Sequence, residues 1–416
     1  MSREGNFRAA AIVLFVAITF LKIGAWTVLQ SRGKVHPFVG SNAASLYIPI
    51  ARRLLTEHRF NGPDSRPDSK VPPAYPLFLA GAMAVSQSSF LALITPLQML
   101  MDLVTAFVLF WMAVRIGLPR TGILAGCVWL LFPPALVIST WITAETLFTT
   151  AFTLGLALFA VSFENSSLTL SLTGGLLMGL ATLLRGTPLF LPLALLPVSL
   201  RFHAAGRWAV FTAAMAVLIV PWSIRNMVVL DDFIPVATGS GSVLLQGADE
   251  RFFTGDGKAA LYPSTFQAAA EAGVRKPDTD RESKLDQWMG QVGVWVQLKR
   301  LKERPFSLVS FFAHKLVRVW YGTESGAFRQ QAILGFCALL VVPVALLQLW
   351  RWRIPHGGMI YVLFSVVAYL VLMHVATLPE ARYAFPLFPV LILCACHFYR
   401  PALDRAAFPN KKGLPT

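Results

Sequence analysis

The chain has 416 residues, of which 56% are hydrophobic and only 14% are charged, and its formal net charge is +15. Soluble domains carry about a quarter charged residues, so this composition excludes an ordinary soluble protein and predicts an all-α polytopic membrane protein. Basic residues at cytoplasmic helix ends explain the positive charge better than nucleic acid does, and the sequence contains no nucleic-acid-binding motif.

Ten apolar segments are expected to cross the membrane as helices. They are 9–30, 91–114, 121–138, 141–163, 168–184, 187–200, 208–221, 331–350, 358–377 and 383–399. With ten spans, the short basic loops around Arg115, Arg201 and Arg353 lie in the cytoplasm together with both termini. Segment 73–85 is too short for an ordinary span, and counting it would invert every later loop. We therefore expect it to be juxtamembrane or re-entrant.

A polar, basic segment, 41–80, interrupts the apolar sequence soon after the first expected span. Apolar and basic residues share 43–55 with helical spacing, which predicts an amphipathic helix on the membrane surface with Pro49 in its first turn. The rest of the segment is rich in turn residues and reaches Lys70 just before two prolines, where the chain becomes apolar again.

Five short motifs follow one another along the chain. They are Y-x3-A-R-x-L-L-x4-F from Tyr47 with P-P-x-Y-P-L-F-L-A from Pro72, an acidic residue before a Leu-Phe pair at Glu145, G-x-x-x-G-x-x-x-L-x-R ending at Arg185, P-W-x-x-R-N from Pro221 to Asn226, and R-Y-x-x-P from Arg382. In this order they resemble GT-C glycosyltransferases, and in particular bacterial family 39 members related to protein O-mannosyltransferases and lipid A aminoarabinose transferases. The resemblance covers roughly 47–389.

The resemblance implies a GT-C fold of about ten transmembrane helices with external juxtamembrane helices. It also implies an enzyme of the bacterial cytoplasmic (inner) membrane. Such an enzyme moves a sugar from a polyprenyl-phosphate donor to a glycan, lipid or protein acceptor at the outer face of that membrane.

Three parts of the chain are expected on this basis. Residues 1–221 form an N-terminal transmembrane catalytic module, which includes the first external loop, 31–72. Residues 222–329 form an external loop with amphipathic helices, and residues 330–416 form C-terminal transmembrane helices and a basic cytoplasmic tail.

Transfer from a polyprenyl-phosphate sugar needs a carboxylate for the acceptor hydroxyl, cations for the departing phosphate and an apolar groove for the lipid tail. The motifs assign the carboxylate to Glu145, at the outer start of a span, where no adjacent cation claims it in the sequence. They assign phosphate binding to four basic residues, Lys70, Arg185, Arg225 and Arg382. Substrate binding is assigned to Tyr47, Asn226 and Tyr383.

Each assignment has a structural alternative. Glu145 could be a solvated helix-end carboxylate favoured by the N-terminal helix dipole, and each basic residue could be an interfacial cation with its head group in water. Aromatic residues also gather at membrane interfaces without any ligand. Of the remaining carboxylates, Asp102 is expected to pair with Lys22 and Glu380 to orient Arg382.

One departure from the resemblance concerns the first external loop. The family carries an Asp about four residues before the Tyr of the first motif, and Ala43 occupies that position. This departure supports an alternative, a catalytically inactive relative that acts as a lipid-binding or scaffold protein. A transporter is less favoured, because intramembrane charge is scarce and no paired broken helices occur in matching halves.

No metal-binding motif is evident in the sequence. The histidines lack the spacing of a zinc or di-metal site, and the four cysteines all lie in apolar segments as expected core residues. A divalent cation at Glu145 is left open.

Overall fold

The computed structural model describes residues 3–40, 43–248, 267–303, 305–324, 326–352 and 357–407. These residues form helices and no strands, apart from isolated bridges that join Phe38 to Trp141 and Asn61 to Pro67. The predicted all-α membrane architecture is therefore confirmed. The loop around Arg353 and the end of the basic tail, 408–416, lie outside the described residues.

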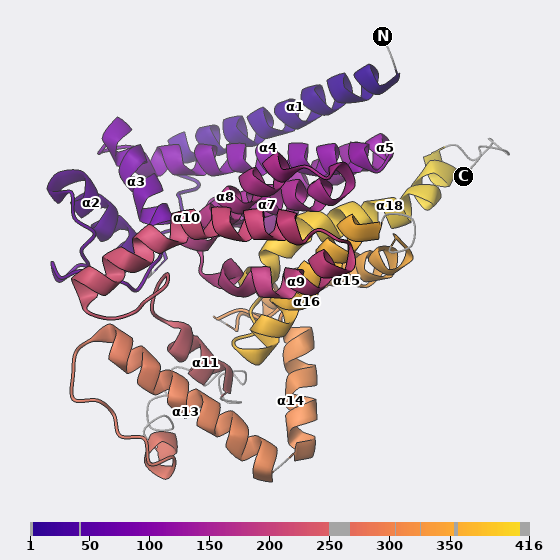
Figure 1. The fold of residues 1–416 in the computed structure, drawn as a ribbon. Helices are drawn as coiled ribbons and strands as arrows, with labels where there is room; N and C mark the ends of the chain where they lie inside the picture. Colours follow the sequence, from indigo (N-terminus) through magenta and orange to yellow (C-terminus); the bar gives the residue numbers. More distant parts are fainter. Residues whose placement is uncertain are drawn as a thin grey trace.

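The long helices form one bundle whose members lie side by side in Figure 1. They are α1 (Arg3–Ser31), α4 (Phe90–Arg115), α5 (Pro119–Leu131), α7 (Glu145–Asn165), α8 (Leu168–Leu184), α9 (Leu191–Arg201), α10 (Ala205–Leu230), α15 (Phe328–Trp352), α16 (Gly357–Ala376) and α18 (Phe388–Ala407). The chain enters at the start of α1 and leaves at the end of α18 on the same side of the view (Figure 1).

The remaining elements connect and cover this bundle. They are the π-helix η1 (Ala43–Tyr47), α2 (Ile48–Glu57), α3 (Ala74–Val85), α6 (Pro133–Ile138), the 3₁₀-helix η2 (Thr187–Phe190), α11 (Ser240–Ala248), α13 (Glu282–Glu303), α14 (Pro305–Arg318), α17 (Ala381–Ala384) and the 3₁₀-helix η4 (Phe385–Leu387). The helix expected over 43–55 is present as η1 and α2, and Pro49 lies in the first turn of α2 as predicted.

Seven helices of the described chain are long and apolar enough to cross a membrane. They are Asn6–Ser31, Phe90–Arg115, Glu145–Asn165, Ala205–Leu230, Phe328–Arg351, Gly357–Ala376 and Ala381–Arg400. The other three expected spans coincide with the shorter apolar helices Pro119–Leu131, Leu168–Leu184 and Thr187–Arg201. The protein is thus multi-pass, and the count of ten spans stays a prediction. Segment 73–85 forms α3, which packs on α2 and α4.

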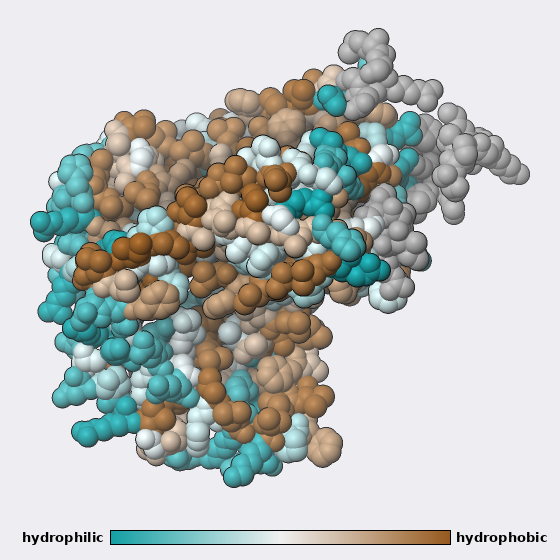
Figure 2. All heavy atoms as spheres, in the orientation of Figure 1, coloured by the Kyte–Doolittle hydropathy of each residue, from teal (hydrophilic) through white to brown (hydrophobic). Residues whose placement is uncertain are grey.

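The surface of the bundle suits a lipid solvent. Figure 2 shows hydrophobic side chains over α10 and its neighbours, while hydrophilic side chains gather around α2 and along the edge formed by α13. Large apolar side chains are exposed on the outer helices, such as Leu21 of α1 and Val228 of α10, which are 73% and 75% exposed. In water so much exposed apolar area would be costly, whereas in a bilayer it faces acyl chains.

Helix α10 continues through Pro221 to Leu230, so the predicted boundary after residue 221 falls inside this helix. Proline removes one backbone donor, but membrane helices tolerate it where neighbouring groups take up the freed carbonyls. The turns before and after the proline stay in one helix, and the hydroxyl of Ser223 just after the proline donates back to Ile219 O, at 3.1 Å. The segment after this helix therefore begins at Asp231 rather than at residue 222, about two and a half turns later than the sequence indicated.

Glycines bring α8 close to the helices on both of its sides. A side chain on Gly179 would come within 2.9 Å of Met215 O in α10, and one on Gly174 would come within 2.9 Å of Gly155 O in α7. Small residues at such spacing let membrane helices approach backbone to backbone. Gly179 of the G-x-x-x-G motif thus faces α10, while Gly174, just before that motif, faces α7, and α8 packs between the two helices.

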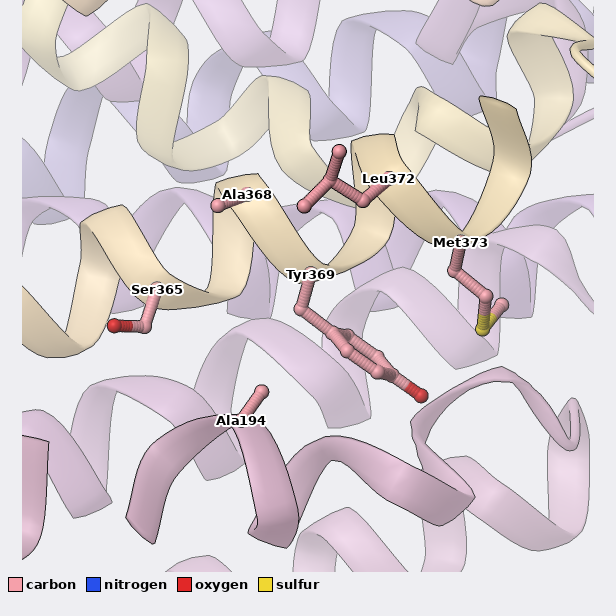
Figure 3. Close-up of a pocket in the computed structure, with 6 residues that line it drawn as sticks. All are labelled: Ala194, Ser365, Ala368, Tyr369, Leu372 and Met373. Atoms are coloured by element: carbon pink, nitrogen blue, oxygen red, sulfur yellow. The ribbon is translucent and has the colours of Figure 1, made fainter. Parts of the chain in front are cut away.

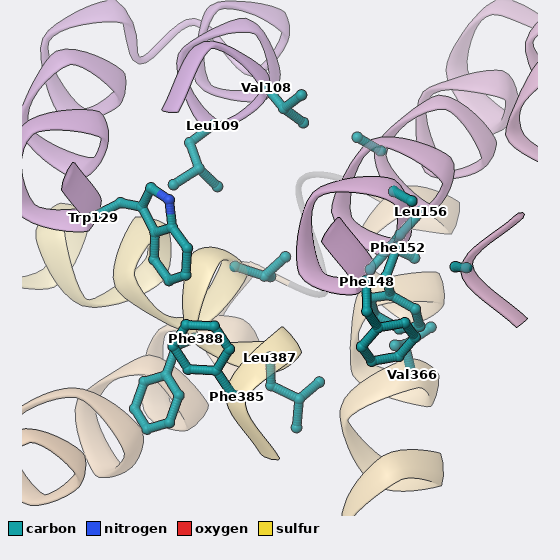
Figure 4. Close-up of a cluster of buried hydrophobic side chains, with 14 of the residues drawn as sticks. Val108, Leu109, Trp129, Phe148, Phe152, Leu156, Val366, Phe385, Leu387 and Phe388 are labelled. Carbon is teal, nitrogen blue, oxygen red and sulfur yellow. The ribbon is translucent and has the colours of Figure 1, made fainter. Parts of the chain in front are cut away.

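The core between the helices is aromatic. Trp129 of α5 packs against Phe385 of η4, with ring centroids 5.4 Å apart, and Figure 4 shows this contact beside Phe388 of α18. Phe385 is 2% exposed. Because α17 directly precedes η4, this burial fixes the short helix that carries Arg382 and Tyr383.

Beyond the bundle, α11, α13 and α14 form a separate group of helices in Figure 1. Helix α14 has an unusual distribution of polarity, because Phe306 and Val309 are 90% and 69% exposed while Lys315 and Arg318 are buried. Exposed apolar residues beside a bundle of apolar helices are typical of an interfacial helix, and the external position expected for 222–329 stays a prediction.

Candidate functional site

The candidate site begins at Glu145, the first residue of α7. The segment before it is held from two directions. Phe38 N donates to Thr140 O at 3.0 Å, and Ile142 N donates to Phe38 O at 2.9 Å. On the other side, the buried amide of Gln98 donates to Trp141 O at 2.8 Å. The backbone just before Glu145 is therefore fixed by Phe38 of the first external loop and by Gln98 of α4.

A cation from a neighbouring helix engages Glu145. The guanidinium of Arg185, which caps the end of α8, forms an ion pair with the carboxylate, and the hydroxyl of Thr143 donates to the same group. The side chains of Arg185 and Glu145 are 19% and 10% exposed. No adjacent residue in the sequence supplies a cation for Glu145, but in the structure Arg185 does so from another helix.

Tyr383 lies beside this ion pair. The Arg185 guanidinium carbon is 4.9 Å from the centre of the Tyr383 ring, and the Arg382 guanidinium donates to the Tyr383 hydroxyl at 3.2 Å. The ring of His374 stacks on Tyr383 with centroids 4.8 Å apart and planes 10° apart. One tyrosine thus contacts two cations and one imidazole.

Arg382 is held by two carboxylates. It lies 2.7 Å from Glu380 and 3.9 Å from Glu324. Glu380 is 1% exposed, and this burial raises the pKa of its carboxyl while Arg382 opposes the shift. The expected role of Glu380 in orienting Arg382 agrees with this geometry.

Tyr47 brings the first external loop into the same group. Burial raises the pKa of its hydroxyl to about 12, the charge of Glu145 adds to the rise, and Arg185 and Arg382 oppose it. The Tyr47 ring meets Tyr75 edge to face at 5.1 Å, and the Tyr75 hydroxyl donates to Gln98 at 3.1 Å. The loop is therefore packed into the site.

Five residues assigned from the sequence thus belong to one cluster of contacts and electrostatic interactions. These residues are Tyr47, Glu145, Arg185, Arg382 and Tyr383, and we refer to them as the ionic cluster. They come from segments dispersed over the chain. Sequence reasoning did not select Tyr75 or His374. Tyr75 is the tyrosine of the P-P-x-Y-P motif, whereas His374 was considered only as a metal ligand.

Arg225 and Asn226 serve another part of the molecule. The Arg225 guanidinium donates to Phe60 O at 2.8 Å and to Asp68 O at 3.0 Å, and it lies 4.9 Å from the centre of the Trp222 ring. Asn226 is fully buried and donates to Ile234 O at 2.9 Å. These contacts fasten the first external loop and the segment after α10 to that helix.

Lys70 forms an ion pair with Glu282 at the start of α13, at 3.4 Å, with both side chains more than 40% exposed. An exposed pair of this type contributes little to stability. Its position links the first external loop to the external helices and leaves the ammonium accessible to solvent.

Two further expectations concern isolated residues. Lys22 and Asp102 form the predicted pair inside the bundle, at 3.4 Å, with both side chains buried. Ala43 is 2% exposed within an apolar cluster, so a small side chain fills the position at which the family carries Asp. Within the described residues, no three His, Cys, Asp or Glu side chains gather to hold a metal ion.

A shallow apolar groove of about 400 Å³ lies between α9 and α16 (Figure 3). It is lined by Ala194, Ser365, Ala368, Tyr369, Leu372 and Met373. The Tyr369 hydroxyl donates to Thr187 O at 2.7 Å, two residues after Arg185, and Met373 directly precedes His374. Two residues that line the groove, Tyr369 and Met373, are therefore close to the ionic cluster along the chain or through a hydrogen bond.

Helix α14 holds the segment that leads into Arg382. The buried ammonium of Lys315 donates to Gly247 O at 2.9 Å and to Thr377 O at 2.5 Å, and Arg318 donates to Pro379 O at 2.9 Å. Burial lowers the pKa of Lys315 to about 7, and the charge of Arg300 lowers it further in the same direction. The external helices are thus coupled to the ionic cluster through backbone carbonyls.

No family model matches the sequence, and no curated protein matches it. Solved structures do match. The archaeal oligosaccharyltransferase AglB from Archaeoglobus fulgidus, in complex with an inhibitory peptide and a dolichol-phosphate, matches 98% of this chain with a TM-score of 0.58 and 14% identity. The apo form of an oligosaccharyltransferase from the same organism matches 97% of this chain with a TM-score of 0.59 and 12% identity.

This chain spans about half the length of those oligosaccharyltransferases, 53% and 52% respectively. A weaker likeness is to ArnT from Cupriavidus metallidurans bound to undecaprenyl phosphate, with a TM-score of 0.42, 17% identity and coverage of 98% of this chain and 80% of that one. This chain therefore shares the fold of those oligosaccharyltransferases, which agrees with the GT-C fold predicted from the motifs.

Proposed function

We propose that this protein is a membrane glycosyltransferase that moves a sugar from a polyprenyl-phosphate donor to an acceptor at the outer face of the bacterial cytoplasmic membrane. The observation that carries the proposal is the ionic cluster, in which a buried carboxylate and two arginines meet where apolar helices end. The GT-C fold supports it, since AglB was solved with a dolichol-phosphate.

The chemistry assigns a distinct role to each charge. Phosphate is a bidentate acceptor for guanidinium groups, so the donor phosphate binds between Arg185 and Arg382. It then competes with Glu145 for Arg185. A carboxylate released from its ion pair is a stronger base, and Glu145 becomes available to the acceptor hydroxyl only when the donor is present.

In the transfer step, the bond between the anomeric carbon and the phosphate oxygen breaks, and a bond between that carbon and the acceptor oxygen forms. The acceptor proton passes to Glu145, and the electron pair of the broken bond leaves with the polyprenyl phosphate. The arginines stabilise the negative charge that develops on the departing phosphate. Tyr47 and Tyr383 supply aromatic faces and hydroxyl groups for the sugar.

The groove between α9 and α16 is the place that we propose for the first part of the prenyl chain. Its lining is mostly apolar, and it follows the same helix, α16, whose end carries His374 beside the ionic cluster. A lipid tail in this groove would stay in contact with the bilayer while its phosphate reached the arginines.

A second candidate is a lipid-binding relative without catalysis. It is favoured by Ala43, which fills the position of the family carboxylate, and by the ion pair that neutralises Glu145. Lipid binding without transfer is the result that this candidate predicts.

The test reconstitutes the purified protein in proteoliposomes with lipid-linked sugars and measures release of polyprenyl phosphate together with glycosylated product. We expect transfer by the wild type. If no sugar is transferred from any donor pool, although polyprenyl phosphate co-purifies or binds, the binding protein is the correct assignment. If neither transfer nor lipid binding occurs, both candidates are wrong.

A further inference from the structure

His374 lies in the last turn of α16 and is 4% exposed. Neither of its ring nitrogens has a hydrogen-bond partner in the part of the chain that the structure describes. Buried polar atoms are nearly always hydrogen-bonded, because an unpaired one has lost its water without gaining a partner. An imidazole with two such atoms is therefore a poor choice for a purely apolar core position.

The surroundings of His374 are those of the ionic cluster. The ring stacks on Tyr383, whose other contacts are the guanidinium groups of Arg185 and Arg382. Stacking fixes the plane of the imidazole, so its two nitrogens point sideways from the stack rather than at the Tyr383 ring. A phenylalanine would stack and fill the same space without any unpaired nitrogen.

We propose that His374 is a donor-binding residue whose ring N–H donates a hydrogen bond to a phosphate oxygen of the polyprenyl-phosphate carrier. The inference rests on the proposed function and adds to it a third ligand of the phosphate group, beside the two arginines. A neutral imidazole has one N–H donor and one acceptor nitrogen, so the second nitrogen remains available for a sugar hydroxyl.

This assignment follows from the charge balance of the ionic cluster. Two arginines are already partly neutralised by Glu145 and Glu380, so their pull on an entering phosphate is reduced. A hydrogen-bonding side chain such as His374, which has no carboxylate partner, adds affinity for the phosphate, because no carboxylate competes for it. A hydrogen bond to a charged group is the type that contributes most, and its loss weakens binding by about 10- to 100-fold.

The test measures binding of undecaprenyl phosphate, without sugar, to the full-length protein in nanodiscs. His374→Phe keeps an aromatic ring that can stack, although a slightly larger one, and removes both nitrogens, whereas His374→Gln keeps a side-chain N–H. We expect His374→Phe to weaken binding about 10- to 100-fold and His374→Gln to weaken it less. The matched control is His203→Phe, at an exposed histidine in the loop before α10, which should bind as the wild type does.

A second measurement detects the proposed contact in the wild-type protein itself. In wild-type protein labelled with ¹⁵N at its seven histidines, addition of the lipid should shift one buried imidazole resonance, which His374→Gln removes. The inference is wrong if wild type and folded His374→Phe bind alike, or if no histidine resonance shifts. If the wild type itself does not bind undecaprenyl phosphate, the proposed function fails together with the inference.

Discussion

Arg185, which caps the end of α8, forms an ion pair with Glu145, which begins α7, although 40 residues separate the two in the chain. Each charge also suits its own helix end, because a carboxylate is favoured at a helix N-terminus and a cation at a C-terminus. The pair joins two helices that pack closely through Gly155 and Gly174. Close packing of the helices therefore creates the charged centre of the candidate site.

The first prediction concerns Glu145. Replacing Glu145 by Gln keeps the shape of the side chain and removes its charge, so the acceptor proton loses its destination. Transfer should fall by about 10²- to 10⁴-fold, as is usual when a general base is lost. Proteoliposome transfer assays measure this, and Glu164→Gln, at the exposed end of the same helix, is the control. Unchanged transfer in folded Glu145→Gln would leave the protein an enzyme with a different base.

The second prediction concerns Arg382. Its guanidinium is held beside Tyr383 by Glu380, in the position that we assign to the donor phosphate. Arg382→Ala should weaken undecaprenyl phosphate binding by about 10- to 100-fold, the loss expected for a hydrogen bond to a charged group. Arg120→Ala, at an exposed arginine near the start of α5, should have no measurable effect. Equal affinities of the two variants would remove Arg382 from the phosphate site.

The third prediction separates two roles for Arg225. If its contacts with Phe60 O and Asp68 O are its function, Arg225→Ala should free the first external loop from α10. The loop should then be cut by added protease at least several-fold faster, and stability should fall by about 1–3 kcal/mol. Proteolysis of the protein in nanodiscs gives the rates. Weaker lipid binding with an unchanged rate of cleavage would instead return Arg225 to the phosphate-binding residues.

The fourth prediction is a pH dependence that arises from Lys315. The pKa of this buried lysine is about 7 in the folded chain, below the value of about 10.4 in the unfolded chain. Between these values the unfolded chain holds the proton that the folded chain has released. Stability should therefore rise with pH across this window, by at most about 1.4 kcal/mol per unit, and the contribution should be constant below pH 7.

Lys315→Met should abolish this part of the slope, because it carries no proton at any pH. Thermal unfolding in detergent between pH 6 and pH 10 measures the difference between wild type and variant. The exposed Lys299→Met provides the comparison. Parallel curves for wild type and Lys315→Met would show that Lys315 does not titrate in this window.

The fifth prediction concerns topology. If ten spans cross the membrane, cysteines placed at Arg115 and Arg201 face the cytoplasm, and a cysteine at Ser65 faces outside. An impermeant thiol reagent added to intact cells should label only the Ser65 position. Labelling at Arg201 from outside would mean that α3 or another short helix has been assigned wrongly.

The amino-acid sequence by itself determined the class of protein and the elements that cross or approach the membrane. The reason is that lipid requires long apolar helices and permits polar backbone only outside the hydrocarbon, so composition and hydropathy are direct consequences of the environment. The order of the motifs also selected Tyr47, Glu145, Arg185, Arg382 and Tyr383. All five lie at helix ends or in adjoining loops, where charged and aromatic residues remain visible against an apolar background.

Only the tertiary structure decided which of these residues meet. Glu145 and Arg185 pair because glycines set the packing of α7 on α8, and no local pattern encodes that register. Arg225 has the same chemistry as Arg185, yet it holds a loop, because carbonyls from distant residues surround it. The sequence shows His374 only as a histidine within an apolar helix, and its stacking on Tyr383 is a property of the tertiary structure. Contacts between distant segments depend on the whole packing arrangement, and they decide what each charged side chain can do.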